Sequence, residues 1–142
     1  MYDEGTRNSN SGINATIFGA SSALGVVTAS SLTRIGSQVT LPYRKMAGQW
    51  DNRFKEIKTT ADLGYKTYLK LQDMTNEKEI AFSLQNSNVA ISCVGSHIFY
   101  KKQAQFEEAN IRVPMAIAKA VRDSPQIKRF VYVSAAGADP NS

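Results

Sequence analysis

The stretch TIFGASSALG, residues 16–25, constrains the fold of this chain more than any other. A run of β-branched and aromatic residues ends at Gly19, and a helical pattern begins just before Gly25. This arrangement is typical of a loop that leaves a strand, cradles a phosphate and enters a helix. Ser22 stands where the middle glycine of the pattern would let a phosphate come closest. The stretch therefore predicts an α/β fold with a modified nucleotide loop.

The serine at the centre of this loop leaves two interpretations open. Gly19 and Gly25 keep two roles of the pattern, the tight turn and the close packing of helix on sheet. A Cβ at Ser22 narrows the approach, but its hydroxyl can still donate a hydrogen bond to a phosphate oxygen. We favour a phosphate site over a merely structural turn. The predicted phosphate-binding residues are Gly19, Ser21, Ser22, Ala23, Leu24 and Gly25.

Strand-like and helical patterns alternate along the rest of the chain. Such alternation predicts a parallel sheet with helices on both faces, in the doubly wound, Rossmann-like order 3-2-1-4-5. Residues 1–12 are polar and are interpreted as a flexible arm, and residues 13–142 as the N-terminal part of a nucleotide-binding domain. We expect a long connection over 43–64. The strands are expected at residues 13–19, 37–42, 65–71, 88–94 and 128–133.

Helices are expected at residues 24–35, 76–85 and 106–122. The first should end at Gly36, which can adopt the left-handed conformation of a helix terminus. Thr75 is the expected N-cap of the second, and Pro114 predicts a kink or a late start in the third. The apolar stripe of the first helix is expected to comprise Leu24, Val27, Leu32 and Ile35.

Two further clues concern the kind of nucleotide. NAD sites place an acid after the second strand, where this chain has Arg44, and a guanidinium suits the 2′-phosphate of NADP(H). After the third strand come Asp73 and Met74. In this topology Asp73 could accept a hydrogen bond from adenine, and Met74 could cover a ring face. An aspartate in a turn is also a common helix cap.

Composition and charge exclude several other functions. The chain has 142 residues, a length suited to one domain, and a net charge of +5 that is scattered rather than concentrated in a nucleic-acid-binding block. No run approaches the roughly 18 apolar residues of a membrane-spanning helix. Cys93 is the single cysteine and His97 the single histidine, so we expect no disulfide within the chain, a reducing compartment and no metal site.

The segments SGINATIFGASSALG, IGSQVTLPYR, ADLGYKTYLKLQDMTN, SNVAISCVG and RFVYVSAAGAD occur in a characteristic order and spacing. Together, over residues 12–139, they resemble the N-terminal half of the atypical short-chain dehydrogenase/reductases that are accessory subunits of mitochondrial respiratory complex I. The glycine loop is common to extended short-chain dehydrogenases. The stretch from GSQVTLPYR to DLG is more specific to the subunit.

The resemblance implies a non-catalytic subunit that holds NADPH as a structural ligand. It implies a peripheral position on the matrix side of the mitochondrial inner membrane, among complex I subunits near the junction of the two arms. The basic pairs Lys101–Lys102 and Lys128–Arg129 would meet protein or lipid headgroups. Transferred to this sequence, the nucleotide residues beyond the glycine loop are Arg44, Asp73, Met74, Cys93, Val94, Gly95, Val133, Ser134 and Ala135.

Catalytic relatives carry a Tyr-x-x-x-Lys pair beyond the fifth strand, in which tyrosine is the general acid. No such pair follows Ser134 in this sequence, and the fold is expected to be incomplete on its C-terminal side. Two alternatives therefore remain. The chain could belong to an NADP-dependent reductase or epimerase whose catalytic lobe lies outside it, with a second chain completing the fold. It could also be an interaction scaffold without a nucleotide, which the replacement at Ser22 suggests.

Overall fold

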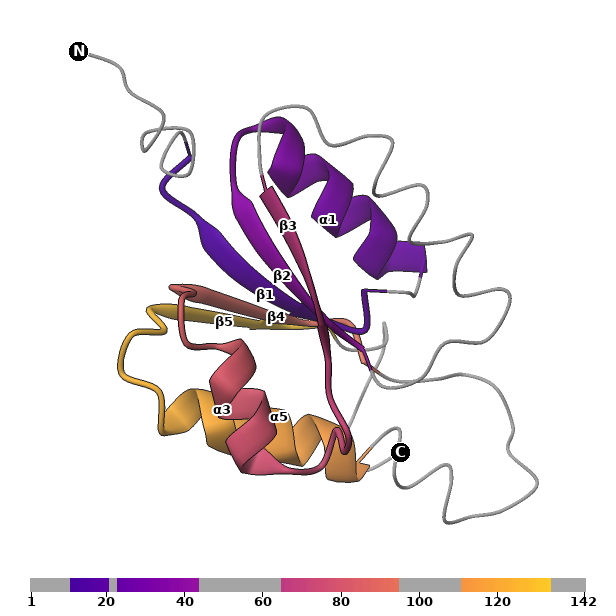
Figure 1. The fold of residues 1–142 in the computed structure, drawn as a ribbon, viewed down its shortest axis with the longest axis vertical. Coiled ribbons are helices and arrows are strands. Elements are labelled where there is room, and N and C mark those ends of the chain that lie inside the picture. Colours follow the sequence, from indigo (N-terminus) through magenta and orange to yellow (C-terminus); the bar gives the residue numbers. More distant parts are fainter. Residues whose placement is uncertain (1–10, 21–22, 44–64, 95–110, 134–142) are drawn as a thin grey trace, which may run out of the picture.

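The computed structural model describes residues 11–20, 23–43, 65–94 and 111–133. Strands and helices alternate along these residues, as the sequence predicts (Figure 1). The strands are β1 (Asn14–Phe18), β2 (Gln38–Tyr43), β3 (Tyr65–Lys70), β4 (Val89–Ser92) and β5 (Arg129–Tyr132). The helices are α1 (Ala23–Arg34), α3 (Glu77–Ser83) and α5 (Val113–Arg122).

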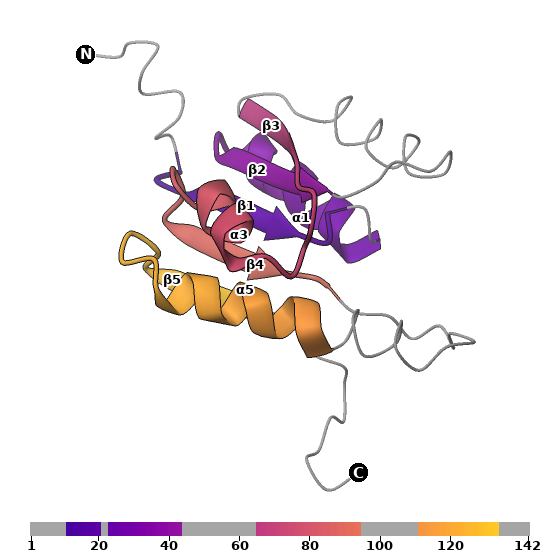
Figure 2. The ribbon, with the colours of Figure 1, turned by 60° about the horizontal axis from the view of Figure 1, so that its bottom comes forward.

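All of these strands run parallel in one sheet of order β3-β2-β1-β4-β5. The predicted doubly wound topology is therefore confirmed. Helix α1 covers one face of the sheet, and α3 and α5 lie side by side on the other (Figures 1 and 2). Each connection brings the chain back to the side where the previous strand began. The carboxyl ends of all strands therefore lie together on the opposite side of the molecule.

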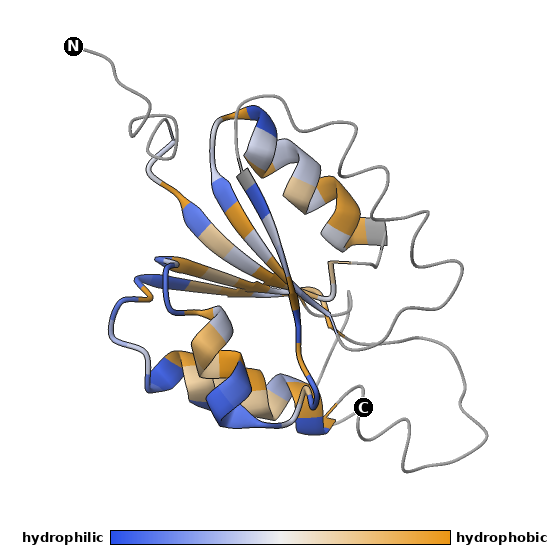
Figure 3. Cartoon of the chain, viewed as in Figure 1, coloured by the Kyte–Doolittle hydropathy of each residue, from blue (hydrophilic) through white to orange (hydrophobic). Residues whose placement is uncertain are grey.

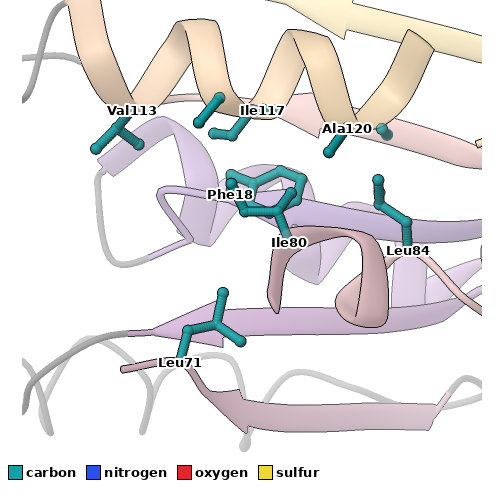
Figure 4. Close-up of a cluster of buried hydrophobic side chains, with 9 residues drawn as sticks. Phe18, Leu71, Ile80, Leu84, Val113, Ile117 and Ala120 are labelled. Atoms are coloured by element: carbon teal, nitrogen blue, oxygen red, sulfur yellow. The ribbon is translucent and has the colours of Figure 1, made fainter. Parts of the chain in front are cut away.

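The core has two parts, one on each face of the sheet. On the α1 face, Ile17 and Leu41 pack with Val26 and Ala29. On the other face, Phe18 is fully buried among Ile80 of α3 and Ile117 of α5 (Figure 4). Thr16 is also buried on this face, and its hydroxyl donates to the Ser83 carbonyl oxygen at 2.8 Å. Both faces of β1 are thus covered, as expected for the central strand of a doubly wound sheet.

The apolar stripe predicted for α1 is wrong. Leu24, Val27 and Ile35 are 48%, 60% and 52% exposed, whereas Val26 and Ala29 are buried and only Leu32 of the predicted stripe packs against the core. The first turns of α1 are correspondingly hydrophobic in Figure 3. The buried stripe runs through Val26 and Ala29, and a pattern that gives little weight to alanine misses it. Gly36 does end the helical region, with φ 91°.

Several element boundaries also differ from the prediction. β2 continues through Pro42 to Tyr43, because its pairing with β1 stops at Thr40 while its pairing with β3 continues. The N-cap of α3 is Asn76 and not Thr75, since the Asn76 side chain accepts from the Lys78 and Glu79 backbone N–H groups.

Helix α5 begins at Val113, directly after two π-helical residues at 111–112, and Pro114 lies in its first turn. The predicted residues 106–110 and the connection 44–64 lie outside the described part of the chain.

The strand β4 is covered less evenly than predicted. Ala90 and Ser92 are buried on the α3/α5 face, but Val89 and Ile91 are only half-buried on the α1 face. Helix α1 packs against β1 and β2, so it covers the neighbouring strands better than β4. An apolar run in the sequence therefore indicated a central strand correctly but overestimated its burial.

Candidate functional site

The predicted site residues follow the carboxyl ends of the strands and therefore share one edge of the sheet. The structure describes Gly19 after β1, Asp73 and Met74 after β3, Cys93 and Val94 after β4, and Val133 after β5. It also describes Leu24 and Gly25, and the backbone of Ala23, at the start of α1. Ser21, Ser22, Arg44, Gly95, Ser134 and Ala135 lie outside the described residues.

Gly19 makes the turn that joins the loops after β1 and β4. Its φ is +76°, a conformation that side-chain-bearing residues rarely adopt. A Cβ there would lie 2.8 Å from the Cys93 carbonyl carbon and 3.0 Å from the Val94 nitrogen. The absence of a side chain thus lets two segments, 74 positions apart in the sequence, pack backbone to backbone at this edge.

Gly25 brings the first turn of α1 against the same turn. A Cβ on Gly25 would collide with the Gly19 carbonyl oxygen and lie 2.7 Å from the Ala20 Cα. No acidic side chain lies in the first turn of α1, so no carboxylate there offsets the positive end of the helix dipole. Gly19 therefore makes the tight turn that its position predicts, and Gly25 lets the first turn of α1 approach residues 19–20. The free N–H groups at a helix start are suited to a phosphate group.

The turn between β3 and α3 is held by side chains instead. The Asp73 carboxylate oxygen Oδ1 accepts from the Thr75 N–H at 2.8 Å and the Thr75 hydroxyl at 2.6 Å. Met74 is half-buried and packs against the core on the α3/α5 face. The backbone N–H of Leu71 donates to the Tyr43 carbonyl oxygen at 2.7 Å, which joins this turn to the end of β2.

Glu79 is a residue of this turn that the sequence analysis missed. Its carboxylate accepts from the Gln72 N–H at 2.8 Å and the Asp73 N–H at 3.2 Å. Asn76 and Glu79 form the pattern of a capping box, in which a glutamate in the first turn of a helix reaches back toward the N-cap. That pattern could have identified Glu79, although here the carboxylate reaches past the cap to the turn.

The remaining predicted residues complete the edge. Cys93 donates its N–H to the Phe18 carbonyl oxygen at 2.9 Å, and its half-buried thiol has a pKa raised by burial. A raised pKa keeps the thiol protonated, so Cys93 is suited to packing and not to nucleophilic chemistry. The Val133 N–H donates to the Ser92 carbonyl oxygen at 3.0 Å, which keeps the segment after β5 beside β4.

A cavity of about 390 Å³ lies apart from this edge, where β2 and β3 face the end of α3. Thr40, Thr67, Phe82 and Gln85 are among its lining residues, and none of the predicted site residues lines it. Its polar lining is uncharged and offers no cation to a phosphate. The candidate nucleotide site is therefore the edge around Gly19 and not this cavity.

Two classes of site find no support among the described residues. They contain no group of three or more His, Cys, Asp or Glu side chains that could hold a metal ion. In the same part of the chain, no helix has both the length and the apolar character that crossing a membrane requires.

Known proteins resemble this chain in sequence over nearly its whole length. The mitochondrial NADH dehydrogenase (ubiquinone) 1 alpha subcomplex subunit 9 of Mus musculus is 35% identical over 133 residues, 94% of this chain and 33% of that protein. The mitochondrial NADH-ubiquinone oxidoreductase 40 kDa subunit of Neurospora crassa is 34% identical over 142 residues, 100% of this chain and 36% of that protein. No family model matches the chain. The chain spans about a third of the length of these relatives.

Solved structures share the fold. A short-chain dehydrogenase/reductase variant from Serratia marcescens aligns with a TM-score of 0.67 and 14% identity, over 91% of this chain and 58% of that one. The protein AtPrR2, solved with NADP+ and (+)pinoresinol, aligns with a TM-score of 0.59 and 16% identity, over 83% of this chain and 35% of that one. The fold is thus that of short-chain dehydrogenase/reductases.

Proposed function

Because this chain is a homologue of the short-chain dehydrogenase-like subunit of mitochondrial complex I, we propose that it serves that assembly as a non-catalytic accessory part. Similarity to the two complex I subunits over 94% and 100% of the chain carries the proposal. We place it peripherally on the matrix side of the inner membrane, among other subunits near the junction of the two arms. In this proposal, residues 1–12 form the N-terminal arm of the chain, and residues 13–142 form the N-terminal part of its nucleotide-binding domain.

We further propose that the chain binds NADPH as a structural ligand. The start of α1 follows directly on the glycine turn and has no acidic residue in its first turn, which supports a phosphate at this helix N-terminus. Arg44 would hold the 2′-phosphate, and Asp73 and Met74 would lie beside the adenine. The segments Cys93–Gly95 and Val133–Ala135 would follow the nucleotide along the edge. A ligand that binds only the folded state, at a thousandfold excess over its Kd, stabilises that state by roughly 4 kcal/mol, which is reason enough to retain it.

The test is to purify the native assembly from mitochondrial membranes without added nucleotide, denature it and measure the released nucleotides by mass spectrometry. Flavin and other nucleotide-binding subunits are counted separately. We expect NADP(H) near one per particle, and its loss from an assembly carrying Arg44→Gln. Arg34→Gln is the matched control, because Arg34 lies in the last turn of α1, at the opposite end from the glycine turn. An assembly without NADP(H) would support the nucleotide-free scaffold instead.

A second candidate is an NADP-dependent reductase or epimerase whose catalytic lobe lies outside this chain. The fold shared with short-chain dehydrogenase/reductases favours it. The candidate requires a Tyr-x-x-x-Lys pair in a continuation or a partner, and hydride transfer in solution. If the completed protein holds NADPH but does not oxidise it with any carbonyl substrate offered, the structural role stands.

A further inference from the structure

The position of Asp73 depends on an exposed turn, residues 71–76, that has little core to hold it. Gln72, Asp73 and Asn76 are all exposed, and only Leu71 is fully buried. Exposed turns of this kind move unless hydrogen bonds fix their backbone. The direction in which Asp73 presents its carboxylate is therefore set by the polar contacts of the turn.

Thr75 holds the Asp73 carboxylate directly, through its N–H at 2.8 Å and its hydroxyl at 2.6 Å, and Glu79 holds the backbone of the turn. Glu79 accepts two consecutive backbone N–H groups, from Gln72 at 2.8 Å and Asp73 at 3.2 Å, and so fixes the peptide plane that enters Asp73. The Asn76 N–H donates to the Asp73 carbonyl oxygen at 3.1 Å, which fixes the peptide plane that leaves it. A carboxylate that accepts two N–H groups makes stronger hydrogen bonds than a neutral acceptor would.

We infer that Glu79 is a positioning residue for the adenine side of the nucleotide site, because its clamp on the Gln72 and Asp73 N–H groups fixes the backbone from which Asp73 presents its carboxylate at the carboxyl edge of the sheet. The inference rests on the proposed function, since it concerns the same NADPH. In this inference the 6-amino group of adenine donates a hydrogen bond to the Asp73 carboxylate. That hydrogen bond forms only while Glu79 holds the two N–H groups of the turn.

The chain offers a matched control in Glu77. Both glutamates lie in the first turn of α3, so removing either one costs that turn the same charge near the helix N-terminus. The Glu77 side chain makes no hydrogen bond within the described residues, and its charge adds a smaller effect to that of Asp123 in raising the pKa of Arg122 on α5. A difference between Glu79→Gln and Glu77→Gln therefore reports the clamp and not the charge.

The experiment compares two ligands in three proteins. Binding of NADPH and of deamino-NADPH, in which an oxygen replaces the 6-amino group, is measured by calorimetry for the parent chain, Glu79→Gln and Glu77→Gln. In the parent, deamino-NADPH should bind about tenfold more weakly, the effect of one hydrogen bond to a charged group. In Glu79→Gln this discrimination should fall to about twofold, because the amide can accept only one of the two N–H groups. Glu77→Gln should keep the parent ratio.

Hydrogen exchange of the Gln72 and Asp73 amides gives a second readout that needs no nucleotide. Both amides should exchange faster in Glu79→Gln than in the parent and in Glu77→Gln. If they do so while the discrimination stays tenfold, Glu79 is structural only and the inference is overturned. If the parent binds no NADPH, the proposed function fails, and the intact amide protection shows that the failure lies with the ligand and not with the clamp.

Discussion

Two turns lie at the same edge of the sheet and are built in opposite ways. The turn from β1 into α1 depends on the absence of side chains, because a Cβ at Gly19 or Gly25 would collide with neighbouring backbone. The turn from β3 into α3 depends on side chains, because those of Asp73, Asn76 and Glu79 accept hydrogen bonds from its backbone N–H groups. A turn defined by close packing should fail sharply when an atom is added, whereas one built from exposed hydrogen bonds should weaken in small steps.

The largest effect is expected at Gly19. Gly19→Ala should lower the free energy of unfolding by about 3 kcal/mol, because it adds left-handed backbone strain to a collision with the Cys93 carbonyl. Gly12→Ala is the control, since Gly12 has a similar φ of +72° but open space around its Cβ position. It should cost only about 1 kcal/mol. Urea-induced unfolding measures both, and equal losses would mean that strain alone makes Gly19 necessary.

Gly25→Ala should show the second largest effect. Alanine is a better helix former than glycine by about 1 kcal/mol, so a free position in α1 would become more stable. At Gly25 the added Cβ meets the Gly19 carbonyl oxygen and the Ala20 Cα, and we expect a net loss of about 2 kcal/mol. Ser31→Ala, at an exposed position of the same helix, should change stability by less than about 0.5 kcal/mol. A stabilised Gly25→Ala protein would contradict the close packing of helix and turn.

The polar turn should respond less. Asn76→Ala should cost about 1 kcal/mol, the usual worth of an N-cap, because the Lys78 and Glu79 N–H groups lose their acceptor. Thr75→Ala removes only the exposed hydroxyl contact with Asp73 and should cost about 0.5 kcal/mol. Thermal or urea unfolding of the two variants decides which residue is the cap. A larger loss for Thr75→Ala would restore the sequence-based prediction.

The same contrast explains which features the sequence could predict. A Cβ at Gly19 or Gly25 would collide with backbone, and Gly36 has a positive φ, so these glycines alone predicted the turn and the helix end. The strand order followed from the alternation of strand and helix patterns, because parallel strands need crossover connections. These features depend on backbone geometry and close packing, which few residue types can satisfy.

Features that depend on choices between similar residues were harder to predict. Thr75 and Asn76 are both good N-caps, and only the backbone entering α3 decides between them. Val26 and Ala29 face the sheet while Leu24 and Val27 are exposed, and two adjacent valines cannot be told apart by size or hydrophobicity. Glu79 acts through a contact with residues six and seven positions earlier, beyond the reach of the standard capping pattern.

The smallest predicted effect concerns Cys93, whose backbone lies against Gly19. Burial raises the pKa of its thiol, so its thiolate fraction at pH 8 should be lower than in the unfolded chain, and iodoacetamide should alkylate it more slowly. The pKa of Cys93 is higher in the folded than in the unfolded state. The contribution of the buried, protonated thiol to the free energy of unfolding is therefore complete below the unfolded-state pKa, and it is lost as pH rises toward the folded-state pKa. Cys93 is the single cysteine, so mass spectrometry of the alkylated chain gives its rate directly. Gly19→Ala should raise the rate by displacing the Cys93 backbone. An unchanged rate in that variant would show that the strand end tolerates the added methyl, and that the two turns differ less than their geometry implies.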